Sequence, residues 1–415
     1  MRMPRAMARL FGRTDAASPS EAKAPARSEA TKPLATLSFS APRRHSGRLH
    51  FGLATADGED EIFFEVPADF HAHPDCMAAC LATLCGTQYR AIHFDFAVSD
   101  PCSAAIANRT GAVVTARGVC SARQPGQAIA LNFSGGFDSL AAFHLAPGLL
   151  TTVAVDFGRN FERERAFFET LNPDLICATD FREKRYDRND WLFMGAVSLL
   201  FADYLDLAAI SFGTIFEATV HNYRLAPATA SRNALIESIG LHDATFTRGL
   251  TEFGTAMVID AYAADQIDRS IVSLADPGSE KSLRKRLLID AARHRGGSAA
   301  PDFDRYVYPT RMSKYGQSYA IDFLGLVFAR LYGREVVSRW VDGLPADLDA
   351  QLAEIDVDWV FRRNPLFDPQ IAEPLRQDVE ARLAGAGIEG FREQDWAGYH
   401  AARQMLETSH RFPTP

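Results

Sequence analysis

The sequence predicts an α/β protein with a parallel-sheet core, preceded by a small α+β domain and followed by a helical region. Strand-like and helix-like segments alternate from about residue 128 to residue 214, which is typical of a parallel sheet covered by helices on both faces. A glycine-rich turn at residues 134–139 joins the first of these strands to its helix. The segments before residue 126 are short β-forming runs between turn residues, and those after residue 332 are amphipathic and helical.

The length of 415 residues exceeds that of one typical domain and indicates several units. We expect residues 1–33 to form a disordered basic tail, because they are rich in Arg, Ala, Pro and Ser and offer little for a core. We expect the α+β domain at 34–126, the parallel-sheet domain at 127–331 and a helical C-terminal cap at 332–415. Pro125 and Gly126 mark the first of these boundaries.

Composition restricts the partners and the compartment. Hydrophobic residues make up 47% of the chain and charged residues 23%, as in water-soluble globular proteins. The net charge of −8 disfavours a nucleic-acid partner. No apolar run approaches the roughly 20 residues that span a membrane, and six cysteines in so long a chain do not indicate a disulfide scaffold. We therefore expect a cytoplasmic protein without a membrane partner.

The first domain begins with three predicted antiparallel strands, separated by Pro/Arg and Asp/Gly clusters. Its predicted elements in chain order are strands at 35–40, 47–54 and 61–66, a helix at 74–84, a strand at 89–98, a helix at 99–110 and a strand at 112–116. Cys76 and Cys80 share a face of the first helix and Cys85 follows it; His71 and His73 are close by, but the pattern lacks the paired C-x-x-C spacing of a structural zinc site. We interpret the cysteines as small apolar residues of a buried helix face.

The second domain alternates strand and helix, and the rest of the chain is mainly helical. Its predicted elements are strands at 128–131, 150–156, 174–178 and 207–212, and helices at about 140–144, 161–170 and 191–204. Helical patterns follow at 235–271, 319–331, 337–340, 348–361 and 371–383. Ligands of parallel sheets bind at the carboxyl ends of the strands, so the turns that follow the strands are the candidate site.

The turn after the first core strand has the composition of a phosphate-binding loop. Gly135 and Gly136 let the backbone approach a ligand closely, and the helix N-terminus adds a partial positive charge. The hydroxyls of Ser134 and Ser139 are further donors. Asp138 would repel phosphate unless Mg²⁺ stood between them, so the loop predicts a magnesium ligand as well.

The sequence S-G-G-F-D-S at residues 134–139 resembles the signature of the PP-loop, or N-type, ATP pyrophosphatase family within the adenine nucleotide α-hydrolase-like superfamily. The resemblance covers roughly residues 128–331 and implies a HUP fold, which is Rossmann-like. It implies ATP and Mg²⁺ as cofactors and a ligase that adenylates a carbonyl or carboxylate oxygen of a small molecule. Pyrophosphate leaves, and an amine or ammonia then displaces AMP to form a C–N bond.

The resemblance also assigns roles to residues by their order along the chain. The loop and the turns after the second and fourth strands are implied to bind the nucleotide through Ser134, Gly135, Gly136, Phe137, Ser139, Asp156, Gly158, Gly213 and Thr214. Asp138 is implied to hold Mg²⁺ as a catalytic residue. Lys314, with Arg311 as its substitute, is implied to offset the charge that develops on the leaving pyrophosphate.

The pattern is closest to 7-cyano-7-deazaguanine synthase, with one departure. Those enzymes carry a cysteine-rich zinc loop, whereas residues 273–287 contain no cysteine, so we expect no zinc and leave the deazapurine substrate open. A basic cluster follows at Lys281, Arg284, Lys285, Arg286 and Arg293. We interpret it as a helix face that is solvated or paired with carboxylates rather than as a nucleic-acid contact.

Two other functions are compatible with the same loop. Sulfur transfer to a nucleoside or tRNA generally needs a reactive cysteine pair, but Cys177 is the only cysteine of the second domain, which favours nitrogen chemistry. A non-catalytic nucleotide-binding subunit of a defence or modification complex is the other alternative. The helical C-terminal region is a candidate surface for a homodimer or an accessory protein.

Overall fold

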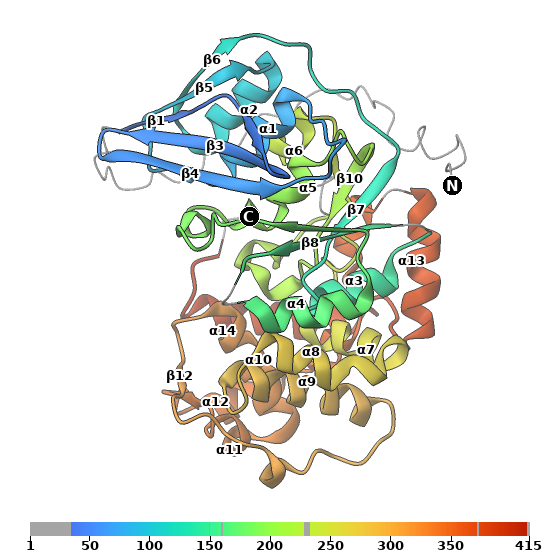
Figure 1. Ribbon diagram of the computed structural model, residues 1–415. Helices are drawn as coiled ribbons and strands as arrows, with labels where there is room; N and C mark the ends of the chain where they lie inside the picture. Colours follow the sequence, from blue (N-terminus) through green and yellow to red (C-terminus); the bar gives the residue numbers. More distant parts are fainter. Residues whose placement is uncertain (1–34, 149, 159–160, 228–232, 372, 413–415) are drawn as a thin grey trace.

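A computed structural model describes residues 35–148, 150–158, 161–227, 233–371 and 373–412 of the chain (Figure 1). The protein is a mixed α/β structure with two main sheets, of which the central one is parallel, and many helices. The α/β class predicted from the sequence is confirmed. The predicted basic tail at 1–33 lies outside the described residues.

The central sheet has five strands, all parallel, in the spatial order β11-β10-β7-β8-β9. Their bounds are Ala128–Asn132 (β7), Thr151–Asp156 (β8), Leu175–Ala178 (β9), Leu207–Ser211 (β10) and His242–Asp243 (β11). The chain first builds outward from β7 to β9 and then returns to add β10 and β11 on the other side of β7. The direction of winding therefore reverses between β7 and β10, where the helices diverge and leave a crevice at the carboxyl ends of these strands.

Short helices connect these strands: α3 (Phe137–Leu145), α4 (Glu162–Phe168), α5 (Ala196–Leu200) and α6 (Ala234–Ser238). The long helix predicted at 191–204 is wrong. Residues Trp191–Gly195 form a 3-10 turn, and α5 continues it for only five residues. Gly195 at the junction is a poor helix former, and a β-carbon there would lie 2.9 Å from the ring of Phe212, so this position packs too tightly for a larger residue.

The N-terminal unit is a mixed six-stranded sheet with two helices. Its strands are β1 (Thr36–Phe39), β2 (Arg43–His45), β3 (Arg48–Thr55), β4 (Gly58–Glu65), β5 (Ala91–Ala97) and β6 (Val113–Gly118), and its helices are α1 (Pro74–Ala82) and α2 (Asp100–Thr110). The strand β3 pairs antiparallel with β1, β2 and β4, as predicted for this segment. By contrast, β5 runs parallel to both β1 and β6.

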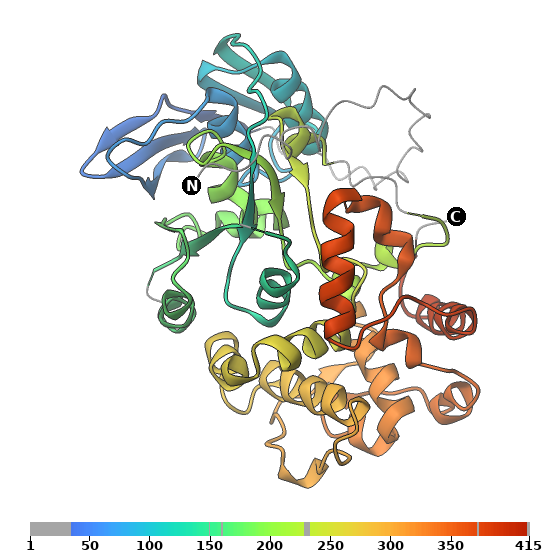
Figure 2. The same cartoon turned by 90° about the vertical axis from the view of Figure 1, so that its right-hand side faces the viewer.

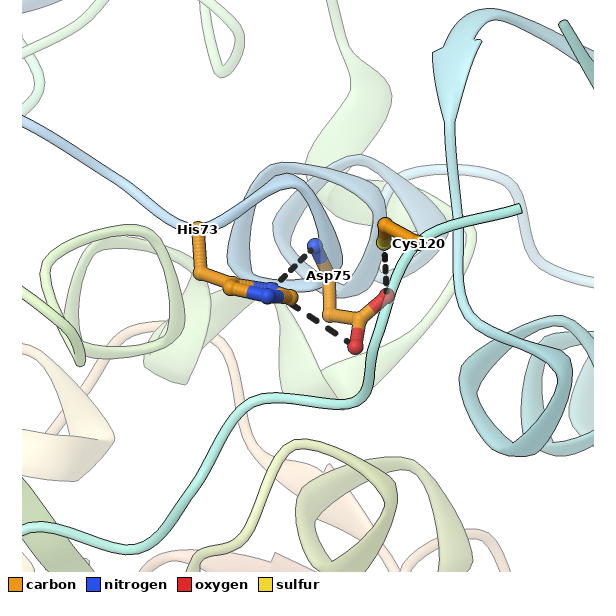
Figure 3. A group of neighbouring side chains, drawn as sticks. All are labelled: His73, Asp75 and Cys120. Atoms are coloured by element: carbon orange, nitrogen blue, oxygen red, sulfur yellow. Dashed lines mark hydrogen bonds and ion pairs between the residues drawn. The ribbon is translucent and has the colours of Figure 1, made fainter. Parts of the chain in front are cut away.

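A buried aspartate joins the helices of this unit to the segment that leaves it (Figure 3). The Asp75 carboxylate accepts the N–H of Ser99, which caps α2, at 2.8 Å and the N–H of Arg123 at 3.3 Å. His73 caps α1 by accepting the Asp75 N–H at 3.2 Å. Burial and the nearby Asp75 raise the pKa of Cys120 to about 11, so its thiol stays protonated at neutral pH. These side chains serve as a structural junction.

One face of the central sheet shares a hydrophobic core with the N-terminal unit, where α1 packs against α5 (Figures 1 and 2). Cys76, Cys80 and Cys85 are fully buried in this core, as the sequence predicted for a buried helix face. Cys177 of β9 is fully buried in the same core. Burial raises the pKa of these thiols well above the usual range.

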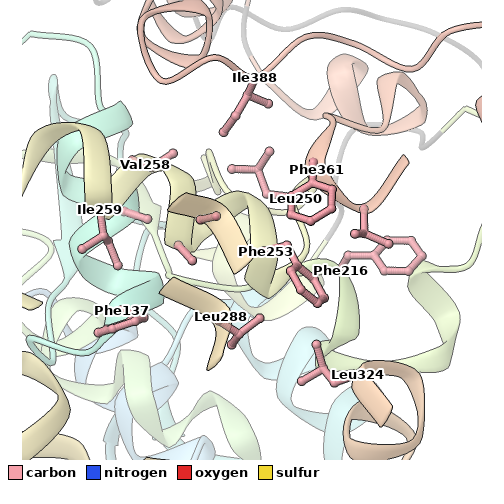
Figure 4. Close-up of a cluster of buried hydrophobic side chains, with 14 of the residues drawn as sticks. Phe137, Phe216, Leu250, Phe253, Val258, Ile259, Leu288, Leu324, Phe361 and Ile388 are labelled. Atoms are coloured by element: carbon pink, nitrogen blue, oxygen red, sulfur yellow. The ribbon is translucent and has the colours of Figure 1, made fainter. Parts of the chain in front are cut away.

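The other face packs against helices from the second half of the chain, and Figure 4 shows Phe137 of α3 in this core near Phe253 and Leu288. The packed helices are α7 (Glu252–Tyr262), α8 (Ile267–Leu274), α9 (Glu280–Arg295) and α10 (Tyr319–Tyr332). The C-terminal region adds α11 (Arg334–Val337), α12 (Leu348–Leu352), α13 (Glu373–Gly385) and α14 (Asp395–Glu407). A small parallel pair, β12 (Ser313–Lys314) and β13 (Val341–Asp342), lies beside them.

Hydrophobic packing continues across both predicted domain boundaries, so the division into domains remains a prediction. The C-terminal residues share the core of α7, α9 and α10, where Trp340 and Trp359 are almost fully buried. Within the described ranges, none of the helices has the length and apolar character needed to cross a membrane.

Candidate functional site

The turn between β7 and α3 keeps its shape because glycine occupies two crowded positions. Gly135 has φ +73°, and a β-carbon there would lie 2.6 Å from the ring of Phe167 in α4. Gly136 precedes the first turn of α3, and no side chain of the described residues caps this helix N-terminus. The first N–H groups of α3 are therefore available to a ligand.

The two serines of the loop bridge its ends. The hydroxyls of Ser134 and Ser139 lie 3.1 Å apart, and the Ser139 hydroxyl donates to the Gly136 carbonyl at 2.9 Å. The Ser134 hydroxyl also accepts the N–H of Gly136 at 3.3 Å. These bonds connect the two ends of the loop, and each hydroxyl oxygen retains a lone pair for further contacts.

The turn after β10 packs directly on this loop. A β-carbon at Gly213 would lie 2.5 Å from the Asp138 carbonyl carbon and the Ser139 nitrogen, so only glycine permits the approach. Below the loop, the Asn132 side chain donates to the Ser211 carbonyl at 3.0 Å and ties β7 to β10. The structure thus brings together the predicted residues Ser134, Gly135, Gly136, Phe137, Asp138, Ser139, Gly213 and Thr214.

A buried network of charges adjoins the loop, and α9 and α7 supply it. Lys285 of α9 has a side chain only 4% exposed, with its Nζ 3.6 Å from Asp138 Oδ1 and 3.0 Å from Glu252 Oε2. Arg284 binds Glu252 at 2.5 Å. Thr255 donates its hydroxyl to Asp138 Oδ1 at 3.0 Å. Asp138 is therefore held by one cation and one hydroxyl from helices far along the chain.

The carboxylates of this network have shifted pKa values in opposite directions. Burial works to raise the pKa of Glu252, but Lys285 and Arg284 outweigh it and lower that pKa to about 2. Burial raises the pKa of Asp138, and the negative charge of Glu252 adds to this while Lys285 opposes it. Glu217, whose carboxylate accepts the Glu252 N–H at 2.9 Å, has no cation in this network, and burial raises its pKa well above the usual range.

One more cation reaches the loop. Lys281 of α9 lines the pocket at the loop, and it forms no ion pair with any carboxylate in the part of the chain that the structure describes. Desolvation and the positive charges of Lys285 and Arg284 lower the pKa of Lys281. A bound anion would relieve this repulsion, so Lys281 is the cation best placed to receive one.

Two neighbouring pockets meet at the loop. The first, of about 370 Å³, is lined by the loop, by the α9 cations and by Trp191, Met194 and Phe212. The second, of about 1070 Å³, shares Asp138, Trp191, Gly213, Thr214 and Glu252 with the first. It extends between α2 of the N-terminal unit and the C-terminal region and includes the buried Glu217. Pockets between structural units are common ligand sites.

Asp156, the last residue of β8, and Gly158, which follows the strand, line a different pocket, of about 450 Å³. The Asp156 carboxylate accepts the Gly158 N–H at 2.9 Å and binds Arg165 of α4 at 2.6 Å. The structure therefore does not bring these two residues into the pocket of the loop, and both carboxylate oxygens of Asp156 already have partners.

Lys314 and Arg311 are not placed at the loop. Lys314 is exposed in β12, where it pairs with β13, and neither residue lines the two pockets that meet at the loop. The cations at the loop come instead from the basic cluster of α9, which was correctly expected to pair with carboxylates. Its spacing at 281, 284 and 285 places all three side chains on one helix face, but nothing in the sequence states which element this face meets.

The chain matches no known protein-family model, no curated protein and no solved structure at a significant level. The site itself combines three groups at the winding reversal of a parallel sheet: a helix N-terminus and a lysine that have, respectively, no side-chain cap and no ion pair among the described residues, and a carboxylate. Anionic ligands and divalent cations are the chemistry that such groups bind.

Proposed function

We propose that the protein is a PP-loop ATP pyrophosphatase-type ligase with a HUP-like core. It would adenylate a carbonyl or carboxylate oxygen of a small molecule, release pyrophosphate, and allow an amine or ammonia to displace AMP. The observation that carries the proposal is the position of residues 134–139 between β7 and β10, the winding reversal of the sheet. In open parallel sheets this is where nucleotides bind.

The residues present fit the phosphates of ATP. Among the described residues no side chain caps the start of α3, and the hydroxyls of Ser134 and Ser139 lie in the loop at this helix end. Lys281 contributes a positive charge with no ion-pair partner among the described residues. Lys281 thus takes the role that the sequence assigned to Lys314, which is to offset the negative charge that develops on the leaving pyrophosphate.

The residues also fit Mg²⁺. Asp138 has a side chain that is 28% exposed, and both of its contacts in the described part of the chain, to Thr255 and Lys285, use Oδ1. Oδ2 can therefore ligate a cation without breaking either contact. Mg²⁺ when bound would neutralise phosphate charge and orient the α-phosphate. Lys285 and Thr255 would hold the Asp138 carboxylate in place.

The larger pocket is the place for the acceptor that becomes adenylated. It opens onto Asp138 and Thr214, so a ligand in it would reach the phosphate loop. Two arginines of this pocket already form ion pairs: Arg109 binds Asp190 at 2.6 Å, and Arg248 binds Asp243 at 2.7 Å. Arg224 forms no ion pair within the described residues, so an acidic group on the acceptor would find its partner there.

Nitrogen chemistry is favoured over sulfur transfer. A thiolating site needs a thiolate near the nucleotide, but Cys177 is fully buried, and burial raises its pKa far above the usual range. In the described residues, no cysteine lines either pocket at the loop. The site therefore offers a place for an amine or ammonia rather than a protein-bound sulfur.

The test is product analysis after incubation with ATP, Mg²⁺ and fractions of a small-metabolite extract. We expect AMP and pyrophosphate with certain fractions for the wild type, and neither for Asp138→Ala. The matched control is Asp95→Ala, which removes a half-exposed aspartate of the N-terminal sheet and should leave turnover unchanged. ADP and phosphate as products would contradict the proposal. ATP binding without turnover in any fraction would favour a non-catalytic nucleotide-binding subunit.

A further inference from the structure

The pocket at the loop has an apolar side whose chemistry the phosphates of a nucleotide do not use. Trp191 is 54% exposed and Met194 is 37% exposed, and both line this pocket together with the buried Phe212. Large apolar side chains exposed together in a pocket indicate a contact with a ligand or partner rather than core packing. Lys281, Arg284 and Lys285 line the same pocket.

Trp191 is held in position by contacts on its buried side. The preceding residue, Asp190, binds Arg109 of α2 with both carboxylate oxygens at 2.6 Å and accepts the N–H of Leu192 at 3.0 Å. The indole packs edge to face on Phe212, with ring centroids 5.5 Å apart and an interplanar angle of 70°. A fixed and half-exposed ring can bind a planar partner at little entropic cost.

We propose that Trp191, supported by Met194 and Phe212, is the stacking platform for the nucleobase of the nucleotide whose phosphates bind residues 134–139. The inference rests on the proposed function and deepens it. A pocket of about 370 Å³ that is lined by both cations and an exposed aromatic ring matches a ligand that has an anionic part and a planar part. Base–aromatic stacking tolerates any base, so the platform supplies affinity rather than base specificity.

The alternative place for the base is the pocket at Asp156 and Gly158. The Asp156 carboxylate has both oxygens bound, to the Gly158 N–H and to Arg165, and so has little left to offer a base edge. Phe157, which separates these residues, is buried against Phe161 and Phe181 and presents no free ring face. Trp191 is the aromatic ring that combines exposure with a direct share in the loop pocket.

Calorimetric titration with two probes tests this inference. Wild type, Trp191→Ala and Trp191→Phe are each titrated with Mg²⁺–ATP and with Mg²⁺–tripolyphosphate, which has the phosphates but no base. We expect Trp191→Ala to weaken ATP binding by roughly five- to hundredfold, the range that loss of one base–aromatic stack spans, and to leave tripolyphosphate binding unchanged. Trp191→Phe should keep most of the affinity. Met312→Ala is the off-site control, because Met312 is as exposed as Met194 but lines neither pocket at the loop.

Tryptophan fluorescence gives a second readout. Trp340 and Trp359 are almost fully buried and Trp396 is partly buried, so the iodide quenching that Trp191→Phe removes is the part that Trp191 contributes, and ATP but not tripolyphosphate should protect that part. Unchanged ATP affinity in Trp191→Ala, or an equal loss for both probes, would overturn the platform while leaving the phosphate site intact. If wild type binds neither probe, the proposed function itself fails and the platform fails with it.

Discussion

The carboxyl edge of the central sheet carries two aspartates that the structure treats differently. Asp156, the last residue of β8, has a side chain that is only 6% exposed. Its two carboxylate oxygens bind Gly158 and Arg165, which both lie in the connection from β8 through α4. Asp138, after β7, is 28% exposed to a pocket, and its partners Thr255 and Lys285 come from α7 and α9. One carboxylate is satisfied locally, whereas the other is held from a distance and keeps an oxygen available.

The difference shows that a position at the end of a parallel strand does not by itself make a site. At β8 and β9 the chain winds in one direction, and residues of α4 and of the paired strands β3 and β4 line the pocket at the strand ends. Between β7 and β10 the winding reverses, the crevice stays open, and distant helices can insert charges into it. Substitutions at the loop should therefore affect stability and ATP binding more than matched substitutions elsewhere.

The largest effect is expected for Glu252→Gln, because it removes the buried carboxylate that Lys285 and Arg284 share and leaves each cation only one partner, Asp138 for Lys285 and Glu280 for Arg284. Loss of one partner from a buried ion pair costs about 3–5 kcal/mol of unfolding free energy. The counterpart, Glu169→Gln, removes one partner from the half-exposed Arg165 and should cost less than about 1 kcal/mol. Urea unfolding of both variants measures the difference, and equal costs would contradict the buried network.

The next effect concerns two glycines. A β-carbon in Gly213→Ala would press on the Asp138 and Ser139 backbone, so we expect a cost of about 1–3 kcal/mol and loss of ATP binding as the loop moves. In Gly158→Ala the strain comes from φ +82°, which costs about 1–2 kcal/mol, and its nearest neighbour is the movable end of Glu183. ATP binding should survive that change. Calorimetry with ATP would expose the contrast, and loss of binding in both variants would favour adenosine contact at Gly158.

A smaller effect separates two lysines that the sequence alone ranks in the opposite order. Lys281→Gln should weaken binding of Mg²⁺–ATP about tenfold, as expected for loss of one charge-assisted contact to phosphate. Lys314→Gln should change ATP affinity by less than twofold, because Lys314 lies in β12 outside both pockets. Thermal unfolding of both variants controls for stability. A larger loss in Lys314→Gln would restore the role predicted from the sequence.

The sequence predicts the part of this structure that short-range physics determines. The alternation of strands and helices, the loop at 134–139 and the buried faces of α1 and α5 all follow from local pattern. The pairing of α9 with that loop does not, because Lys285 lies 147 residues after Asp138 and only tertiary packing joins them. The family resemblance assigns Lys314 to the phosphates by its order along the chain. Order along the chain does not give distance in space, and Lys314 lies in β12, outside the pocket of the loop. The broken helix at 191–204 reflects tight packing of Gly195 on Phe212, a tertiary contact that overrides helix periodicity.

The smallest effect tests the buried acid beside the loop. Burial raises the pKa of Glu217, so the folded protein retains a proton that the unfolded chain releases near its usual pKa of about 4.3. Stability is therefore lost as pH rises above that value toward the folded pKa. Glu217→Gln keeps an oxygen to accept the Glu252 N–H but cannot ionise, so its melting temperature should exceed that of wild type by a few degrees at pH 8 and approach it at pH 4, below the unfolded pKa. The exposed Glu335→Gln should show no such pH dependence. A loss of stability in Glu217→Gln at pH 8 would mean that Glu217 is ionised in the folded protein. The cations of α9 would then stabilise its charge in the larger pocket.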